Sequence, residues 1–150
     1  MMKIQAQNLR AIASVIENHE CRQWLIVITR ARQHWQRLTP DFYIGEYMCR
    51  DGSTMILIDK RLSEGLQGMR DYLRRPILII SAFRTPEHNA AVGGAEHSEH
   101  MTGKAADIHI TGMTGQQIAD TARRFGFTGI GIASTWAHVD VRDTPAEWRY

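Results

Sequence analysis

The residues best suited to chemistry lie in two short segments of the second half of the chain. His100 and Asp107 stand seven positions apart, and His138 follows about thirty residues later. A zinc ion that takes part in chemistry usually has three protein ligands, drawn from imidazole nitrogen, thiolate and carboxylate oxygen, and keeps a fourth position for water. His100, Asp107 and His138 would supply this set, so the sequence predicts a catalytic zinc site.

The local sequence also indicates how these side chains can meet. Gly103 lies between His100 and Asp107 and lets the chain turn, so that a loop histidine and a strand aspartate reach one point. His138 and Asp140 are two apart on a predicted strand and therefore share a face. A carboxylate beside a zinc-bound water can take its proton as the water attacks a carbonyl. We therefore expect Asp140 to act as the general base of an amide hydrolysis.

Hydrophobic spacing predicts the elements that position these residues. Helical spacing favours helices over residues 9–16 and 24–38, although residues 24–29 are equally strand-like, and a further helix over 62–73 that ends before Pro76.

The second half predicts two more helices and several strands. One helix starts after Thr85 as N-cap, and the other starts at a capping box of Thr114 with Gln117 and ends near Gly126. Strands are expected at 77–80, 105–110, 129–132 and 136–141, the last two as a hairpin. Helices first and short-linked strands afterwards favour an α+β domain.

Length and composition are consistent with one domain. The chain has 150 residues, of which 43% are hydrophobic and 23% charged, enough for one core and too few for two comfortable domains. Cys21 and Cys49 fit no metal-binding spacing and indicate buried free thiols rather than a disulfide framework.

Charge and hydropathy narrow the class of partner. The formal net charge of +2 is too small to indicate a nucleic-acid partner. Residues 1–40 carry a net charge of +4 (six basic against two acidic residues), which is consistent either with attraction to an anionic surface or with a solvated helix face. No run is long enough to span a membrane, and the first ten residues lack the features of a signal peptide. We expect synthesis in the cytoplasm, so that any target outside the membrane would need a separate export or release route.

A longer motif surrounds the first two candidate ligands. The pattern Ser-x-His-x-x-Gly-x-Ala-x-Asp, from Ser98 to Asp107, resembles the zinc-ligand signature of the D-Ala-D-Ala carboxypeptidase family. That family includes carboxypeptidases, bacteriophage endolysins and the Hedgehog signalling domain. The resemblance covers roughly residues 40–142 and also involves the segments Phe42–Arg50, Ser81–Asn89, Val92–Ala95 and His138–Asp140.

This resemblance implies a zinc peptidase that acts on the peptide stems or cross-links of peptidoglycan. It implies the Hedgehog/DD-peptidase-like fold, an α+β domain with a small, mainly antiparallel sheet flanked by helices. The ligands would be His100, Asp107 and His138. Arg84 would lie near the substrate, where its guanidinium binds a carboxylate or stabilises an oxyanion, with a structural ion pair as the alternative. Ser98 would either bind substrate or fix the loop around His100.

One position departs from the family pattern. Several members carry an acid three residues before the last histidine, where this chain has Thr135. Asp140 is then the favoured base, with Glu99 and Glu96 as alternatives. Asp140 as third ligand, with His138 in a catalytic or supporting role, also stays open. His97 and His109 are secondary candidates for lining the site.

Two functions therefore remain. The first is a peptidoglycan carboxypeptidase or endolysin-type endopeptidase, and the second is a zinc-stabilised binding or virion-structural module of the same fold without turnover. The second function stays open because this chain has Thr135 where several family members have an acid that can serve as the base. The sequence leaves open the oligomeric state and the role of residues 1–39, expected to form a helical extension of the single domain.

Overall fold

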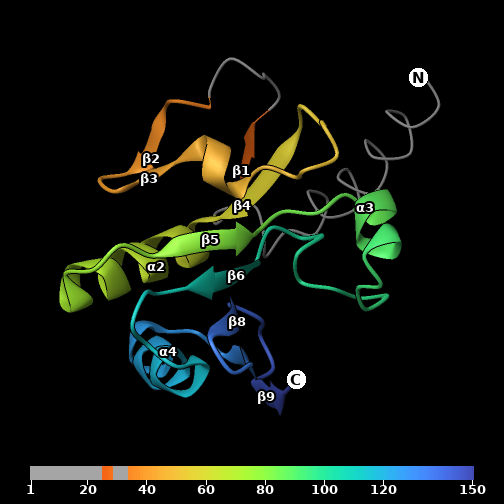
Figure 1. Ribbon diagram of the computed structural model, residues 1–150. Helices are drawn as coiled ribbons and strands as arrows, with labels where there is room; N and C mark the ends of the chain where they lie inside the picture. The colour runs from red at the N-terminus through yellow and green to blue at the C-terminus, as the bar shows by residue number, and fades with distance from the viewer. Residues whose placement is uncertain (1–24, 29–33) are drawn as a thin grey trace.

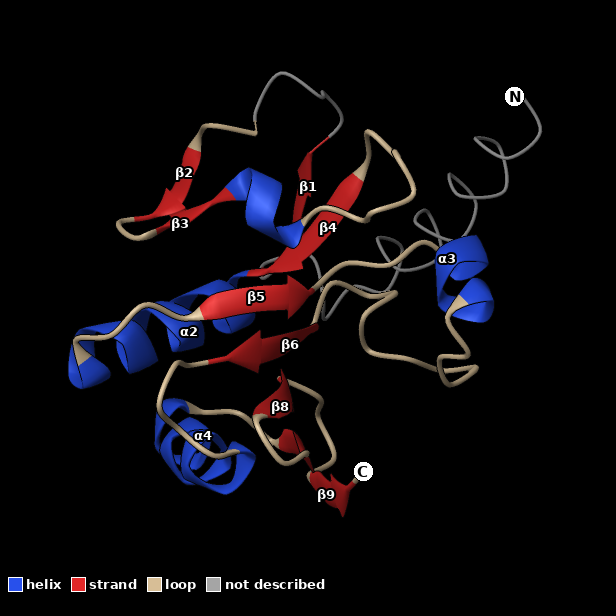
Figure 2. Cartoon of the chain, viewed as in Figure 1, coloured by secondary structure: helices blue, strands red, loops and turns tan. Residues whose placement is uncertain are grey.

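The main structural unit is a five-stranded sheet with strand order β5-β6-β8-β7-β9. The computed structural model describes residues 25–28 and 34–150. Every neighbouring pair in this sheet is antiparallel except β7 and β9, which are parallel. The α+β class with a mainly antiparallel sheet is thus confirmed (Figures 1 and 2). The strands are β5 (Leu78–Ser81), β6 (Ala105–His109), β7 (Gly129–Ile132), β8 (Trp136–Asp140) and β9 (Ala146–Arg149).

Two smaller sheets precede the main one. They are formed by β1 (Leu25–Ile28) with β4 (Ile56–Asp59), and by β2 (Arg37–Thr39) with β3 (Phe42–Tyr43), which leads into the 3-10 helix η2 (Ile44–Tyr47).

Where the structure describes residues 24–38, the expected helix is wrong, and the strand-like alternative is confirmed at residues 25–28. Residues 25–28 form a strand that pairs antiparallel with β4, because a β-branched run suits either element and a strand partner is available. The expected helix over residues 9–16 lies outside the described residues, as do Cys21 and most of the basic segment.

The three predicted helices of the remaining chain are confirmed, together with their capping residues. They are α2 (Lys60–Leu73), α3 (Pro86–Ala91) and α4 (Gly115–Ala122), the last continued by the 3-10 turn η3 (Arg123–Phe125). The Thr85 side chain accepts a hydrogen bond from the His88 amide at the start of α3, and Thr114 forms its capping box with Gln117. In the described part of the chain, no helix has the length and apolar character needed to cross a bilayer.

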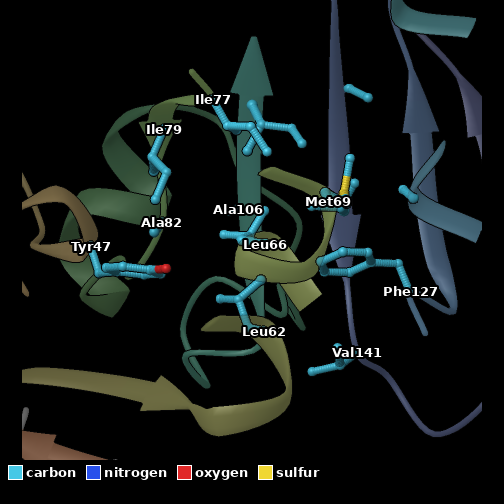
Figure 3. Close-up of a cluster of buried hydrophobic side chains, with 14 of the residues drawn as sticks. Tyr47, Leu62, Leu66, Met69, Ile77, Ile79, Ala82, Ala106, Phe127 and Val141 are labelled. Atoms are coloured by element: carbon cyan, nitrogen blue, oxygen red, sulfur yellow. The ribbon is translucent and has the colours of Figure 1, made fainter. Parts of the chain in front are cut away.

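One face of the main sheet belongs to the hydrophobic core. Because side chains alternate along a strand, one set of positions on β6, β7 and β8 points to this face. These residues are buried: Ala106, Ile108, Ile130, Ile132, Ala137 and Val139. Leu62, Leu66 and Met69 of α2 belong to the same cluster, and Figure 3 shows Leu66 near Ala106. This face of the sheet is therefore held in place by hydrophobic packing in the same cluster as α2.

The alternate positions form a row across the opposite face. The strand register places Ser81 opposite Asp107, Asp107 opposite His138, His138 opposite Gly131, and Gly131 opposite Trp148. Two of the predicted zinc ligands are therefore direct neighbours on adjacent strands.

Candidate metal centre

Three side chains converge at the end of this row. His100 comes from the loop between α3 and β6, Asp107 from β6 and His138 from β8, and all three are buried. Gly103, with φ of 74°, makes the turn that brings the loop histidine back to the strand, as expected. These residues form a group that could hold a metal ion.

The facing atoms form a nearly equilateral triangle. His100 Nε2 lies 3.2 Å from His138 Nδ1 and 3.3 Å from Asp107 Oδ1, and His138 Nδ1 lies 3.0 Å from Asp107 Oδ1. Bonds of about 2.0–2.1 Å in a tetrahedral zinc site separate the ligand atoms by about 3.3–3.4 Å. The triangle therefore fits three corners of a zinc tetrahedron with little rearrangement.

Each histidine is oriented by a hydrogen bond on its other ring nitrogen. His100 Nδ1 donates to the Ala82 carbonyl at 2.6 Å, and His138 Nε2 donates to Asp140 Oδ2 at 2.9 Å. These bonds fix the tautomers so that His100 Nε2 and His138 Nδ1 carry lone pairs toward the centre.

The carboxylate of Asp107 is shared between the centre and Arg84. Arg84 Nη2 donates to Asp107 Oδ2 at 2.7 Å, and Arg84 Nε donates to Ser81 Oγ at 3.0 Å, which leaves Asp107 Oδ1 facing the histidines. Burial disfavours the charged form, but the contacts with His100 and His138 hold the pKa of Asp107 well below its ordinary value. Asp107 is therefore an anionic ligand at neutral pH.

Asp140 lies behind His138 and not beside the centre. Its carboxylate is wholly buried and accepts hydrogen bonds from His138 Nε2 and from the side chain and backbone amide of Arg142. Burial opposes ionisation, yet the hydrogen bonds from His138 and Arg142 keep the pKa of Asp140 well below its ordinary value. This position differs from the one expected of a general base, because the His138 ring separates the Asp140 carboxylate from the triangle.

The charge of Asp140 also acts on His138. Burial lowers the pKa of an imidazole, but hydrogen bonds to Asp107 and Asp140 outweigh it and raise the pKa of His138. Asp140 thus holds His138 through Nε2, the ring nitrogen that faces away from Asp107, which is the arrangement seen around metal-binding histidines.

A cavity of about 510 Å³ opens over the three candidate ligands. It is also lined by Arg84, Ser98, His97 and Glu99, all singled out in the sequence. Since the ligand triangle faces this cavity, a fourth metal position would be accessible from it.

The remaining candidates divide into those at the cavity and those away from it. Ser98 Oγ accepts a hydrogen bond from the His100 amide at 3.4 Å, a contact that fixes the loop. His109 Nδ1 donates to the Thr135 carbonyl at 2.8 Å, and neither residue lines the cavity. Glu96 is exposed and also lies outside the lining.

Sequence reasoning missed four residues at this site. Trp136, Arg142, Trp148 and Tyr150 line the cavity. Their only signal in the sequence is alternation: Trp136 shares a strand face with His138, and Trp148 precedes Tyr150 by two. The pairing of β9 with β7, which brings the last two to the site, involves a strand that was not predicted.

Comparison with known proteins identifies the relatives of this arrangement. The zinc D-Ala-D-Ala carboxypeptidase of Streptomyces albus G is 41% identical over 66 residues, which amount to 43% of this chain and 26% of that protein. The aligned segment thus spans about a quarter of the relative's length. A family model described as peptidase M15 matches residues 40–141, about two thirds of the chain, and this match contains all three candidate ligands. The chain belongs to the peptidase M15 family.

Proposed function

We propose that this chain is a zinc peptidase that hydrolyses a peptide bond in the stem peptides or cross-links of peptidoglycan. The observation that carries the proposal is the triangle of His100 Nε2, Asp107 Oδ1 and His138 Nδ1, with sides of 3.0–3.3 Å, facing the cavity. Membership of peptidase M15 and the name of the Streptomyces relative support the reaction class.

Zinc is the metal that these donors favour. Two imidazole nitrogens and one carboxylate oxygen form a typical catalytic zinc set, with the fourth position left to water or substrate. When bound, zinc lowers the pKa of a water molecule and polarises a carbonyl group. The protein's part is to present the three ligands and the groups around them in fixed positions.

Arg84 has two tasks in this proposal. Through Nη2 it holds Asp107 Oδ2, and this fixes which carboxylate oxygen faces the histidines. Its guanidinium also lines the cavity, and the contacts to Ser81 and Asp107 use only Nε and Nη2. We assign the remaining donors to a substrate carboxylate or to the developing oxyanion, because a guanidinium stays charged at every working pH.

Glu99 is our candidate for the proton acceptor. Among the described residues that line the cavity, the carboxylates are those of Asp107 and Glu99, and Asp107 is occupied as a ligand. Glu99 would accept a proton from the attacking water and return it to the leaving amine. Asp140 then acts as a positioning residue that orients His138, and Ser98 holds the loop of His100.

The bond proposed first is D-Ala-D-Ala, after the name of the relative, and an endolysin-type cut elsewhere in the stem is the second choice. The place of action would be the cell wall or periplasm.

The test is the release of D-alanine from a synthetic acyl-D-Ala-D-Ala peptide. Zinc-loaded protein should release it, chelation should abolish release, and added zinc should restore it, whereas His100→Ala should stay inactive. Tight zinc binding without release of D-alanine, or of any fragment from longer stem peptides, would reject the peptidase and favour the binding module.

A further inference from the structure

The last strand adds an aromatic wall to the cavity. We use this term for Trp136, Trp148 and Tyr150, which line the cavity together with the candidate ligands. Trp148 and Tyr150 lie beyond the family match, which ends at residue 141, and they reach the site because β9 pairs in parallel with β7.

The wall is built across a glycine. Gly131 on β7 stands between His138 on β8 and Trp148 on β9 in the cross-strand row. A Cβ at residue 131 would lie 2.6 Å from Trp148 Nε1 and 2.8 Å from Tyr150 Cε2. The missing side chain therefore leaves the space in which both rings lie against the sheet beside His138.

The rings contact each other and the metal centre. The Trp148 ring lies 5.1 Å from the His138 ring and 6.2 Å from the Tyr150 ring between centroids, and Tyr150 lies 4.8 Å from Trp136. The Arg142 guanidinium covers Trp148 at 5.1 Å. Trp148 is half-buried, whereas Tyr150 is 67% exposed, so Trp148 is the more enclosed of the two rings.

This placement limits the size of what can bind beside the centre. A ring in contact with a metal ligand leaves no room between them for a long side chain, while its apolar surface attracts CH groups. The same cavity is also lined by Arg84 and Ser98, which suit the polar backbone and carboxylate of a peptide.

We propose that Trp148 and Tyr150 form a specificity wall that accepts an alanine-sized side chain next to the scissile bond and excludes larger ones. The inference rests on the proposed peptidase function for its substrate class, and it assigns the selection of that substrate to β9.

The test compares two sets of acyl dipeptides, with alanine or with leucine at either position of the scissile bond. Trp148→Ala and Tyr150→Ala should lower the preference for alanine over leucine in kcat/KM about tenfold, the scale of a changed apolar contact in a pocket. Gly131→Ala, which leaves both rings present but displaces them, should change the same preference. Trp35→Ala and Tyr72→Ala remove an exposed tryptophan and an exposed tyrosine that do not line the cavity and should leave it unchanged.

Binding provides a readout that does not depend on turnover. The alanine peptide should change the tryptophan fluorescence of the zinc-loaded protein and of Trp35→Ala. The change should be smaller in Trp148→Phe, in which Trp136 is the tryptophan that still lines the cavity. Trp148→Phe keeps an aromatic ring, so it also serves if Trp148→Ala does not fold, as judged by thermal unfolding.

The outcomes separate this inference from the proposed function. If the protein binds alanine peptides more tightly than leucine peptides, loses this preference in Trp148→Ala and cleaves neither, the wall stands and the peptidase proposal fails. If the protein cleaves and every wall variant keeps the preference of the parent, the peptidase stands and the wall is rejected. A parent protein that neither binds nor cleaves alanine peptides rejects both.

Discussion

Among single residues, the geometry of the candidate metal centre depends on two side chains that are not themselves ligands, Asp140 and Arg84. The position of His138 is set by Asp140, and the free oxygen of Asp107 is set by Arg84. The ligand set is recognisable from sequence because it resides in a short, spaced motif. The role of Asp140 is not, because alternation gives its face of the strand but not its depth. A Cβ at Gly129 on the next strand would lie only 2.0 Å from the Asp140 carboxylate, so that glycine creates the space in which Asp140 is buried.

The first prediction concerns Asp140. Asp140→Asn removes the anionic acceptor of His138 Nε2, and we expect zinc affinity to fall about 10- to 100-fold, as for other partners of metal-binding histidines. Competition with a fluorescent chelator measures this. Asp143→Asn, whose side chain is 78% exposed, is the matched control and should bind zinc normally. Unchanged affinity in Asp140→Asn would refute the positioning role.

For Glu99 we expect a loss of activity without a loss of zinc affinity. Glu99→Gln removes the proton acceptor but no ligand, so kcat should fall at least about 100-fold while zinc affinity is kept. Steady-state kinetics with zinc titration on the same samples separates the two quantities. Glu96→Gln, a change of an exposed neighbour outside the cavity, should retain full kcat. A fully active Glu99→Gln would contradict the role of Glu99 as proton acceptor and leave His97, which also lines the cavity, as the next candidate.

Among the helices and strands, the sequence predicted those features that depend on residues close together in the chain. The caps at Thr85 and Thr114 and the hairpin of β7 with β8 follow from nearby residues, and the structure has them. The β1 and β9 strands depend on distant partners, β4 and β7, and no local pattern distinguishes them from a helix or a tail. The aromatic wall was missed for the same reason.

The loop that carries His100 should be sensitive at Gly103. An alanine there must adopt φ of 74°, and its Cβ would lie 2.5 Å from the Leu57 carbonyl oxygen. We expect Gly103→Ala to lower the free energy of unfolding by about 2–3 kcal/mol. Gly93→Ala is the control, since φ is also positive but nothing lies near its Cβ, and it should cost about 1 kcal/mol. Chemical denaturation of both variants measures the difference, and equal costs would contradict the close packing.

The Asp51 carboxylate links Thr85, at the start of α3, to the turn that precedes β4. Burial opposes ionisation of Asp51, but hydrogen bonds from Thr85 and Ser53 lower its pKa below the ordinary value of 3.8. The folded state therefore favours the carboxylate, and its stabilisation is present above about pH 4 and lost as pH falls through the lowered pKa.

Asp51→Asn should accordingly destabilise the protein near neutral pH by less than about 1 kcal/mol, because solvent screens this exposed side chain. The difference from the parent should shrink toward zero in strong acid. Urea denaturation of both proteins near neutral pH and in acid tests the direction of the pKa shift. A difference in the free energy of unfolding that grows in acid would show that folding raises the pKa of Asp51.

In the whole molecule, the two faces of the main sheet have different roles. One face packs against α2 and α4 through the hydrophobic core. The other face presents, in one cross-strand row, the candidate ligands Asp107 and His138 together with Ser81 and Trp148. A rigid sheet is suited to hold ligand atoms at tetrahedral spacing before the metal arrives. Sequence could predict the α+β class from its elements, but the row requires the register, which is set only when all five strands assemble.

We propose that this preformed triangle binds zinc and thereby hydrolyses peptide bonds of peptidoglycan. The most direct measurement is mass spectrometry of purified peptidoglycan after incubation with the zinc-loaded protein, with metal content determined on the same samples. We predict new amino and carboxyl ends at one type of peptide bond, lost on chelation and in His138→Ala together with bound zinc. Stoichiometric zinc in the parent protein with no new ends in peptidoglycan of several chemistries would show that the site binds zinc without hydrolysing these peptides.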